Sequence, residues 1–374
     1  MILSMKLIAR IKLLATDDQK NALADTMHAA NSACNALSNL AWNKGVFGQY
    51  ALHNLAYHPI KDETGLTAQV MVRCIAKVAD AYKLDKRRKR TFNLDGAIAY
   101  DDRILRWYTD QRLVSIWTTA GRLKIHYAGG TKDHAYLQCQ KGESDLIRSK
   151  GEFYLFATCQ VPDAGPMDVE GVLGVDLGIV NLASDSDGNV YSGERVNSYR
   201  RRSERVRAEV QSKGTKSAKR KLKQLSGKQK RFQKDTNHVI SKRIVANAQR
   251  TKRAIAIEDL KGIRSRTRVI RKVQRSRHSN WAFYQLRQYI EYKAKKVGLP
   301  MIEVDPRYTS QRCSSCGHVE KANRKTQAEF VCKACGHTDL ADHNAAVNLS
   351  WAAVNRPIVS AQARDKLSAL ADSY

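Results

Sequence analysis

The sequence is poor in acidic residues relative to basic ones. Its 374 residues include 36 Asp and Glu against 65 Lys and Arg, a formal net charge of +29 at neutral pH. A deficit of this size indicates a polyanionic partner, with nucleic acid first and an anionic membrane second.

Long apolar runs are also missing, so we expect no transmembrane helix. Three basic residues interrupt the N-terminal stretch MILSMKLIARIKLLA and spoil the apolar region of a signal peptide: Lys6, Arg10 and Lys12. The alternation of apolar and polar residues over 7–13 predicts a β-strand instead. We therefore expect nucleic acid rather than a membrane as partner, in a prokaryotic cytoplasm.

The chain has few cysteines outside one cluster, and it has no internal repeat. Four of its eight cysteines are scattered singly in apolar surroundings: Cys34, Cys74, Cys139 and Cys159. Small, weakly polar thiols in such surroundings are predicted to be core residues.

Secondary-structure patterns change along the chain. A capping box at Thr16 and Gln19 opens a predicted helix, and a second helix is expected over 67–83. Alternating β-branched and aromatic residues from about 91 to 161 predict a small antiparallel β-domain, which the first strand rejoins. Residues 162–171 have the composition of a linker.

Strands and helices alternate from Val172 onward. Asp187 and Gly188 form a hairpin-turn dipeptide, whereas the stretch DSDGN lacks the glutamate that would make it a calcium loop. Residues 200–234 are helix-compatible and carry 15 Lys and Arg against two Glu, a net +13, and 261–278 are basic without an acid.

Asp176 stands within the apolar stretch GVDLGIVN, where a buried carboxylate is costly unless something compensates its charge. In a strand, Val172, Gly174 and Asp176 share one face, and Gly174 is expected to leave open space beside the carboxylate. Asp176 therefore needs a partner.

Two further acids end or begin apolar elements. Glu258 ends the strand AIAIE on its small-residue face, and Asp342 opens the helix ADHNAAVN. Taken singly, each acid has an ordinary explanation. Asp176 pairs with an arginine, Glu258 ends a strand at the surface, or Asp342 caps its helix. Taken together, the three acids are better explained by divalent cations that they share. Hard oxygen ligands select Mg²⁺ or Mn²⁺, and two such ions stabilise the attacking and leaving oxygens of a phosphodiester. This predicts a nuclease.

The clustered cysteines form two CxxC pairs, Cys313 with Cys316 and Cys332 with Cys335, separated by fifteen residues. This spacing predicts a zinc ribbon with a structural ion, because four thiolates complete a tetrahedron and leave no position for substrate. His318 and His337 are adjacent alternative ligands. The ribbon precedes Asp342 and is expected to help position it.

The motifs GVDLGIVN, IAIEDL, YTSQRCSSCG…FVCKACG and ADHNAAVN occur in this order, and the chain from about 171 to 355 resembles the TnpB family. These are accessory proteins of small bacterial and archaeal insertion sequences, similar to compact type V CRISPR effectors. The resemblance implies α/β plus β-barrel architecture: an RNase H-like (RuvC) nuclease domain with an inserted zinc ribbon, and an N-terminal β wedge domain with a helical recognition insert. The implied domains are 1–15 with 91–165 (wedge), 16–90 (recognition), 171–307 with 339–355 (nuclease), 308–338 (ribbon) and 356–374 (a tail without assigned role).

The resemblance further implies an RNA-guided DNA endonuclease whose metal-binding triad is Asp176, Glu258 and Asp342, with two Mg²⁺ or Mn²⁺ ions and one structural Zn²⁺. A guide RNA from the element pairs with double-stranded target DNA beside a short motif, and the activity supports transposon maintenance and DNA recombination. We expect one chain per guide RNA.

Candidate nucleic-acid contacts follow from charge. The helical row Gln69, Arg73 and Lys77 is either a solvated face or a contact row. Basic candidates in the C-terminal half are Arg200, Arg201, Lys219, Arg220, Lys221, Arg264, Arg266 and Arg268.

Two alternatives remain at this stage. One is a nuclease-inactive, RNA-guided DNA-binding repressor, although the presence of all three acids argues against it. The other is a guide-free nuclease that selects branched DNA by its structure.

Overall fold

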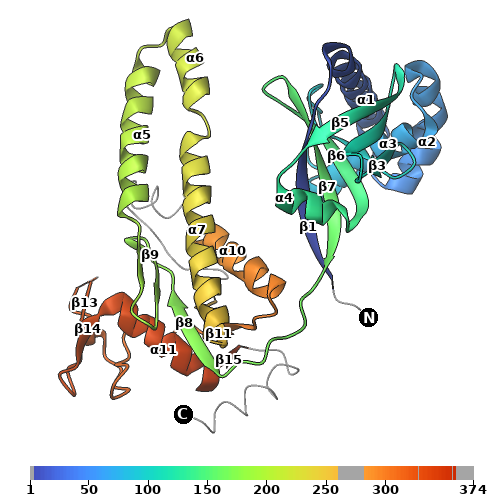
Figure 1. Ribbon diagram of the computed structural model, residues 1–374. Coiled ribbons are helices and arrows are strands. Elements are labelled where there is room, and N and C mark those ends of the chain that lie inside the picture. Colours follow the sequence, from blue (N-terminus) through green and yellow to red (C-terminus); the bar gives the residue numbers. More distant parts are fainter. Residues whose placement is uncertain (1–3, 260–281, 327, 356, 359–374) are drawn as a thin grey trace. The chain divides into compact units, whose positions relative to one another are not determined.

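The predicted N-terminal strand is β1 (Ser4–Leu13), which lies in the middle of a seven-stranded antiparallel sheet of order β2-β6-β7-β1-β5-β4-β3. The computed structural model describes residues 4–259, 282–326, 328–355 and 357–358, and the chain divides into two units, Met1–Pro162 and Asp163–Tyr374 (Figure 1). The other strands of the first unit are β2 (Ile98–Tyr100), β3 (Leu105–Tyr108), β4 (Leu113–Thr118), β5 (Gly121–Ala128), β6 (Gln140–Ser149) and β7 (Glu152–Pro162).

This sheet curls until its ends approach each other. Tyr100 of β2 donates a hydrogen bond from its hydroxyl to the carbonyl of Trp117 in β4, at 3.2 Å, so the sheet is nearly closed. β1 pairs with β7 from Ser4 to Lys12, which confirms that the first strand rejoins the β-domain.

Four helices complete the first unit: α1 (Asp17–Lys44), α2 (Gln49–Thr64), α3 (Ala68–Leu84) and α4 (Thr131–Leu137). The predicted capping box is present, because the Thr16 hydroxyl accepts from the Gln19 amide and the Gln19 side chain accepts from the Thr16 amide. Cys34, Cys74 and Cys159 are buried in the core, as predicted, whereas Cys139 is only half-buried. Helices α2 and α4 were not predicted.

The second unit contains a six-stranded sheet of order β10-β9-β8-β11-β12-β15. Its strands are β8 (Gly171–Asp176), β9 (Asn181–Asp185), β10 (Val190–Ser192), β11 (Arg253–Glu258), β12 (Met301–Val304) and β15 (Pro357–Ile358). The neighbours β8, β11 and β12 are parallel, whereas β9, β10 and β15 are antiparallel to the strands beside them. The predicted tail therefore begins with a short edge strand.

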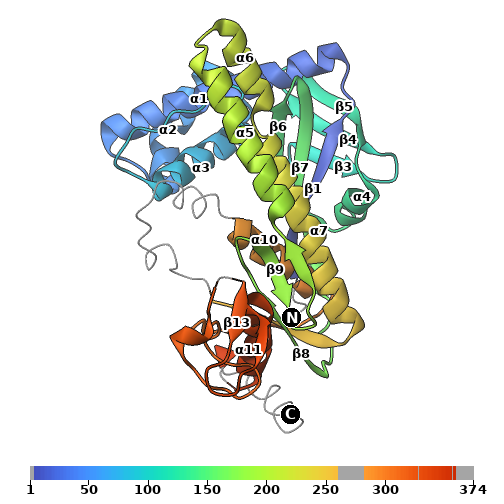
Figure 2. The same cartoon turned by 90° about the vertical axis from the view of Figure 1, so that its left-hand side faces the viewer.

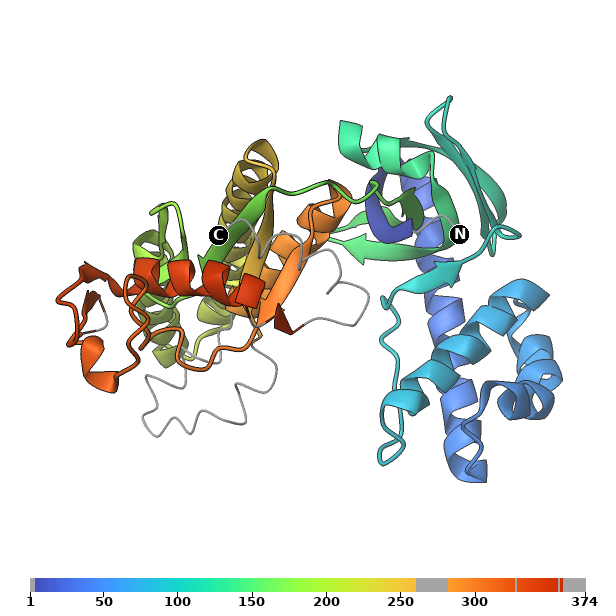
Figure 3. The same cartoon turned by 90° about the horizontal axis from the view of Figure 1, so that it is seen from below.

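Helices cover both faces of this sheet. The described helices of the unit are α5 (Glu194–Ser212), α6 (Lys216–Leu225), α7 (Lys228–Arg250), α10 (Ala282–Lys296) and α11 (Ala341–Asn355). Leu173, Val175 and Ile257 pack with residues of α7 and α10, while Val172 and Ala256 pack with residues of α11. Alternate strand residues thus face opposite layers, as the pattern predicted, and Figure 3 shows α11 lying across the strands.

Gly174 occupies the point where α11 approaches β8. A Cβ atom at this position would overlap the carbonyl oxygen of Ala346 and lie 2.8 Å from the amide nitrogen of Ser350. The space beside Asp176 is therefore filled by the α11 backbone, and the expectation of open space there was wrong. Glycine is needed because two backbones meet without room for a side chain.

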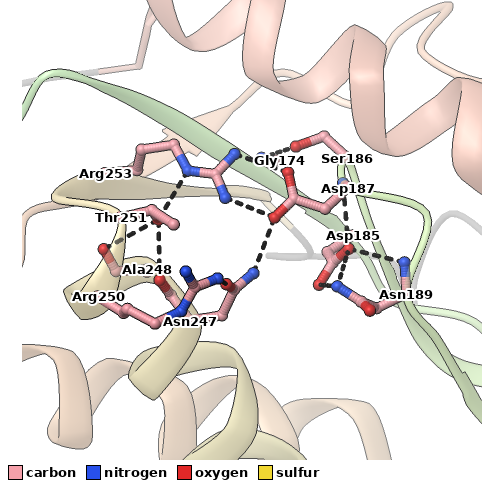
Figure 4. Close-up of polar contacts among 10 residues, drawn as sticks. All are labelled: Gly174, Asp185, Ser186, Asp187, Asn189, Asn247, Ala248, Arg250, Thr251 and Arg253. Atoms are coloured by element: carbon pink, nitrogen blue, oxygen red, sulfur yellow. Dashed lines mark hydrogen bonds and ion pairs between the residues drawn. The ribbon is translucent and has the colours of Figure 1, made fainter.

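The turn between β9 and β10 is fixed by polar contacts (Figure 4). Arg253 pairs with Asp187, which also accepts a 2.8 Å hydrogen bond from Asn247 of α7. Oδ1 of Asp185 accepts from the amides of Asp187 and Asn189 at 3.1 and 2.9 Å. Both acids of DSDGN are thus bound by other protein groups, which agrees with rejecting a calcium loop. Gly188 has the positive φ of 82° that such a turn requires.

The basic segment 200–234 forms most of a long hairpin, α5 and α6, that returns into α7 (Figure 2). Among the described residues, α5 contains no buried residue and α6 contains only Ala218. Within the described ranges, no helix has the length and apolar character that a bilayer span requires.

Candidate active site

Asp176 and Glu258 are brought together by two parallel strands. Strands β8 and β11 pair in register from Gly171 with Arg253 to Val175 with Ile257, and the two acids are the next residues on each strand. Both strands end at the same edge of the sheet. The predicted convergence of these two acids follows directly from this register.

Asp342 reaches the same edge from α11, in the first turn of that helix. The close approach of α11 to β8 at Gly174 carries the start of the helix toward Asp176. Asn181, at the start of β9, donates a 2.9 Å hydrogen bond from Nδ2 to Oδ2 of Asp342. The GVDLGIVN stretch therefore supplies both one acid and a side chain that holds another.

The three acids lie near enough to influence one another's ionisation. Desolvation first, and then the charges of Glu258 and Asp342, raise the pKa of Asp176 to about 8. Desolvation also raises the pKa of Glu258, against a hydrogen bond from Thr309 and the nearby charge of Arg324. Without a cation, ionisation of all three carboxyl groups at once is thus unfavourable.

Arg324 approaches the site from the ribbon segment, with its guanidinium 3.7 Å from Oδ1 of Asp342. Among the described residues, Asp176 and Glu258 form no ion pair with a lysine or arginine. Ion pairing with arginine therefore does not compensate the charges of all three acids, as a bound metal would. Among the described residues, a group of three or more potential metal ligands within 4.8 Å of one another is found only at the four ribbon cysteines. The carboxylate oxygens of the three acids are therefore more widely spaced than the cysteine sulfurs.

The residues present fit divalent cations. Three carboxylates converge where their ionised forms repel, which is the situation that a bound Mg²⁺ or Mn²⁺ relieves, and carboxylate oxygen is the ligand that these ions prefer. Asp176, Glu258 and Asp342 are the side chains available to hold them.

The four cysteines form a second candidate metal site. Sγ of Cys313 lies 3.7 Å from Sγ of Cys335, and Sγ of Cys316 lies 3.6 Å from Sγ of Cys332. All four sulfurs lie within 4.8 Å of one another, which suits one tetrahedral Zn²⁺.

Each CxxC pair lies in a tight turn. The amide of Gly317 donates to the carbonyl of Cys313 at 3.0 Å, and that of Gly336 donates to the carbonyl of Cys332 at 3.1 Å. Both glycines have positive φ, 76° and 74°. The pKa of the Cys332 thiol is lowered to about 6, chiefly by a hydrogen bond from the backbone amide of Cys335. The lower pKa favours the thiolate that a metal needs.

Neither neighbouring histidine belongs to the cysteine cluster. Nε2 of His318 lies 3.1 Å from Glu320, and Nε2 of His337 lies 3.4 Å from the hydroxyl of Ser314. The cluster therefore consists of cysteines alone, as the spacing predicted.

The ribbon is joined to the acidic site by polar side chains. The ribbon contains η1 (Lys321–Asn323), β13 (Glu329–Val331) and β14 (Thr338–Leu340). Asn344 of α11 accepts from the amide of Ser314 at 2.9 Å, and Asn348 donates to the carbonyls of Thr309 and Arg312 at 3.0 and 2.7 Å. The segment that enters the ribbon is thus held against the helix that carries Asp342.

Sequence patterns alone did not single out Thr309, Asn181 or Arg324. Thr309 donates a 2.8 Å hydrogen bond to Glu258, yet it is 51 residues away in sequence. Their positions in the sequence could have indicated a role for two of them, because Thr309 and Asn181 lie within the quoted motifs that also contain the metal-ligand candidates.

The predicted row on α3 contacts the rest of the first unit. Arg103 donates to Gln69 at 2.8 Å, Arg73 pairs with Glu143 at 2.7 Å, and Lys77 donates to Asn31 and to the carbonyl of Ala97 at 2.6 and 2.7 Å. The row is therefore not a simple solvated face. Its contact with DNA stays a prediction.

The other basic candidates lie in the α5–α6 hairpin or outside the described residues. Arg200 and Arg201 are on α5, and Lys219, Arg220 and Lys221 are exposed on α6. Arg264, Arg266 and Arg268, with the 261–278 run, lie outside the described residues.

Two family models match residues that lie almost entirely in the second unit. A model described as a probable transposase matches residues 159–264, which include Asp176 and Glu258. A model of the Cas12f1-like TNB domain matches residues 283–349, which include the four cysteines and Asp342.

Relatives with curated descriptions match about half of the chain. A CRISPR-associated endodeoxyribonuclease Cas12f1 from Sulfoacidibacillus thermotolerans is 33% identical over 231 residues, 56% of this chain and 53% of that protein. A putative RNA-guided DNA endonuclease InsQ from Escherichia coli K12 is 28% identical over 54% of each chain. A TnpB-like protein from Methanocaldococcus jannaschii is 32% identical over 41% of this chain and 59% of that one. The chain spans about half the length of these relatives.

Solved structures agree with the fold. A Cas12f1–sgRNA–target DNA complex has a TM-score of 0.62 at 16% identity, covering 90% of this chain and 83% of that one. A mini-RNA-guided endonuclease, CRISPR-Cas phi3, has a TM-score of 0.56 at 10% identity, covering 94% and 92%. The predicted fold class, a RuvC-like nuclease fold with a zinc ribbon and an N-terminal β-barrel with a helical insert, is confirmed, while its finer division into domains stays a prediction. The resemblance stated from the sequence motifs is confirmed as well, since the matching family models describe a probable transposase and a Cas12f1-like domain, and the relatives include a TnpB-like protein and an RNA-guided DNA endonuclease.

Proposed function

We propose that this protein is an RNA-guided DNA endonuclease of a transposable element, with Asp176, Glu258 and Asp342 as its metal-binding acids. The observation that carries the proposal is the convergence of these three carboxylates at one edge of the nuclease sheet. The names of its relatives, an RNA-guided DNA endonuclease and a CRISPR-associated endodeoxyribonuclease among them, support the same activity.

The acids would hold two Mg²⁺ or Mn²⁺ ions. Such ions supply Lewis-acid stabilisation of the charge that develops on the attacked phosphodiester. Within the chain, Asn181 orients Asp342 and Thr309 orients Glu258 through their hydrogen bonds, so the carboxylates are held before substrate binds. The four cysteines would hold one structural Zn²⁺.

The proposed partners are a guide RNA transcribed from the element and double-stranded target DNA beside a short motif. Base pairing would supply sequence specificity, while the basic surface holds the nucleic-acid backbones without reading sequence. The excess of 65 basic over 36 acidic residues fits this division. One chain per guide RNA and a role in transposon maintenance belong to the same proposal.

The test begins with RNA that copurifies with the expressed protein, which is sequenced and used to design a matched target. Asp176→Ala should abolish Mg²⁺-dependent cleavage of that target while RNA binding survives. Asp168→Ala, on an exposed aspartate of the same unit, is the matched control and should cleave normally.

Other outcomes select other functions. Intact cleavage by Asp176→Ala would refute the proposed site. Tight target binding by the wild type without Mg²⁺-dependent nicking would favour a nuclease-inactive repressor, and cleavage of branched DNA after RNase treatment would favour a guide-free nuclease.

A further inference from the structure

Arg287 of α10 is a buried cation. Among the described residues it is the only buried lysine or arginine, with 7% of its surface exposed. Its neighbours on the helix, Leu286 and Ile290, pack into the core on one face of the six-stranded sheet. A cation in such surroundings is costly unless carboxylates accompany it.

Two carboxylates accompany Arg287, and both come from the ends of strands. Its guanidinium pairs with Glu303 of β12 and lies 3.7 Å from Oδ1 of Asp259, the residue that follows β11. The backbone amide of Asp259 donates to the carbonyl of Val304 at 2.9 Å. Arg287 therefore bridges the carboxyl ends of two neighbouring parallel strands.

The end of β11 is supported on one side only. β11 pairs with β8 as far as Ile257, whereas Glu258 pairs with β12, opposite Val304. The candidate metal ligand Glu258 is thus the first residue of β11 beyond the pairing with β8. The residue after it, Asp259, is the one that Arg287 contacts.

Arg287 and Glu258 belong to opposite faces of the sheet. Glu303 pairs with Ile257, which packs with residues of α7 and α10. Glu258 pairs with Val304, which packs with residues of α11. Arg287 therefore acts on Glu258 through the backbone of β11 rather than by contact with its carboxylate.

Stability alone is a weak reason for this buried ion cluster. Buried ion pairs cost about as much in desolvation as they return, and well-packed apolar side chains of similar size often stabilise a fold as well. Leu286 and Ile290 show that apolar side chains fit this part of α10. What an arginine adds is direction, because its planar guanidinium holds two carboxylates in a fixed arrangement.

We propose that Arg287 is a positioning residue for the metal site, which holds the carboxyl ends of β11 and β12 together and so fixes the direction of Glu258. Thr309 restrains the carboxylate of Glu258 by its hydrogen bond, and Arg287 restrains the backbone from the other face. The inference rests on the proposed function, because it takes Glu258 as a metal ligand.

The experiment measures Mn²⁺ affinity by isothermal titration of the zinc-loaded protein, with thermal unfolding in parallel. Asp176→Ala defines the binding that belongs to the acids. Arg287→Met removes the cation and keeps most of the side-chain volume, and Arg287→Lys keeps the charge without the planar group. The matched control, Arg253→Met, removes the cation that pairs with Asp187 at the opposite end of β11 (Figure 4).

Arg287→Met should weaken Mn²⁺ binding about tenfold, as expected when a group that orients a metal ligand is removed. The sign is informative, because the loss of a positive charge near the acids would by Coulomb attraction alone strengthen cation binding. Arg287→Lys should recover only part of the affinity, since an ammonium group lacks the planar geometry. Arg253→Met should change the affinity by less than about twofold, because it acts at the remote end of the strand.

A triple variant separates positioning from stability. Arg287→Met alone leaves two carboxylates without their shared cation and should lower the melting temperature. Asp259→Asn/Arg287→Met/Glu303→Met removes all three charges and should regain most of that stability, yet its Mn²⁺ affinity should stay about tenfold below that of the wild type. The triple variant also provides the test if Arg287→Met does not fold.

Wild-type Mn²⁺ affinity in the triple variant would overturn the inference and leave Arg287 with a purely structural role. Unchanged or tighter binding by Arg287→Met, or equal losses in Arg287→Met and Arg253→Met, would overturn it too. If Asp176→Ala binds Mn²⁺ as the wild type does, the acids are not the metal site and the proposed function fails. If Asp176→Ala loses binding while Arg287→Met keeps it, only the positioning role fails.

Discussion

Thr309 donates a hydrogen bond of 2.8 Å from its hydroxyl to Oε1 of Glu258, and this contact connects the entry of the zinc ribbon to an acid of the candidate nuclease site. The same threonine is held by α11, since Asn348 donates to its carbonyl. Thr309 thus couples the end of β11, the ribbon and the helix of Asp342.

Replacing Thr309 with valine should weaken Mg²⁺ or Mn²⁺ binding about tenfold, because the hydrogen bond that orients Glu258 is lost while the volume of the side chain is retained. Isothermal titration with Mn²⁺ measures this directly. Thr309→Ser keeps the hydroxyl and should restore most of the affinity. Equal weakening by both variants would indicate a packing role for the methyl group instead.

Gly174→Ala should lower the free energy of unfolding of the second unit by about 3 kcal/mol or more, since a methyl group there overlaps the α11 backbone, which has no room to move. Hydrogen exchange of peptides from β8 and α11 locates the effect. Gly165→Ala is the matched control, because no atom lies within 4 Å of a Cβ placed there. A Gly174→Ala protein that protects β8 as the wild type does would contradict the packing described.

Purified protein should contain one zinc ion per chain, and Cys316→Ser should remove it. Loss of zinc is expected to increase hydrogen exchange at the start of α11 as well as in the ribbon, because Asn344 and Asn348 tie the two together. Elemental analysis with exchange measurements tests both points. Cys139→Ser, outside the cluster, should retain the metal, and retention by Cys316→Ser would argue against a four-cysteine site.

The stability of the protein without added Mg²⁺ should fall as the pH rises toward 8. The folded state keeps a proton on Asp176 up to about pH 8, whereas the unfolded carboxyl loses its proton near pH 4. Between these values the folded state binds more protons, so the free energy of unfolding decreases with increasing pH. Thermal melts over this range measure the slope, which Asp176→Asn should reduce.

Added Mg²⁺ should reduce the same slope and release protons at neutral pH, since the metal binds the ionised carboxylates. Titrations in buffers of different ionisation enthalpy measure that release. A pH-independent melting temperature in the wild type would show that Asp176 is already ionised in the folded protein.

Local patterns in the sequence predicted much of the fold, including the two strands that carry Asp176 and Glu258 to the same sheet edge. Alternation along Val172–Asp176 correctly assigned its residues to two faces, because a strand buried on both sides must present each face to a different layer. The spacing of the cysteines was also sufficient to predict that they cluster. The glycine that follows each CxxC pair has the positive φ expected of a tight turn.

Contacts between distant segments were harder to predict. The α11 backbone fills the space beside Gly174, and no local pattern distinguishes such a glycine from one that leaves a gap. Lys77, placed on a polar helical face, instead donates to Asn31 of α1 and the carbonyl of Ala97, because the β-domain packs beside that face. Pairings of this kind depend on the tertiary arrangement rather than on periodicity.

The hairpin of α5 and α6 contributes almost nothing to either layer that packs on the six-stranded sheet, and its turn at Gly214 lies among exposed residues. Changes in its length therefore destabilise the core of the second unit little. A foreign domain grafted between Lys213 and Thr215 should leave the sheet folded, which makes this loop a practical place to attach a reporter or an additional effector.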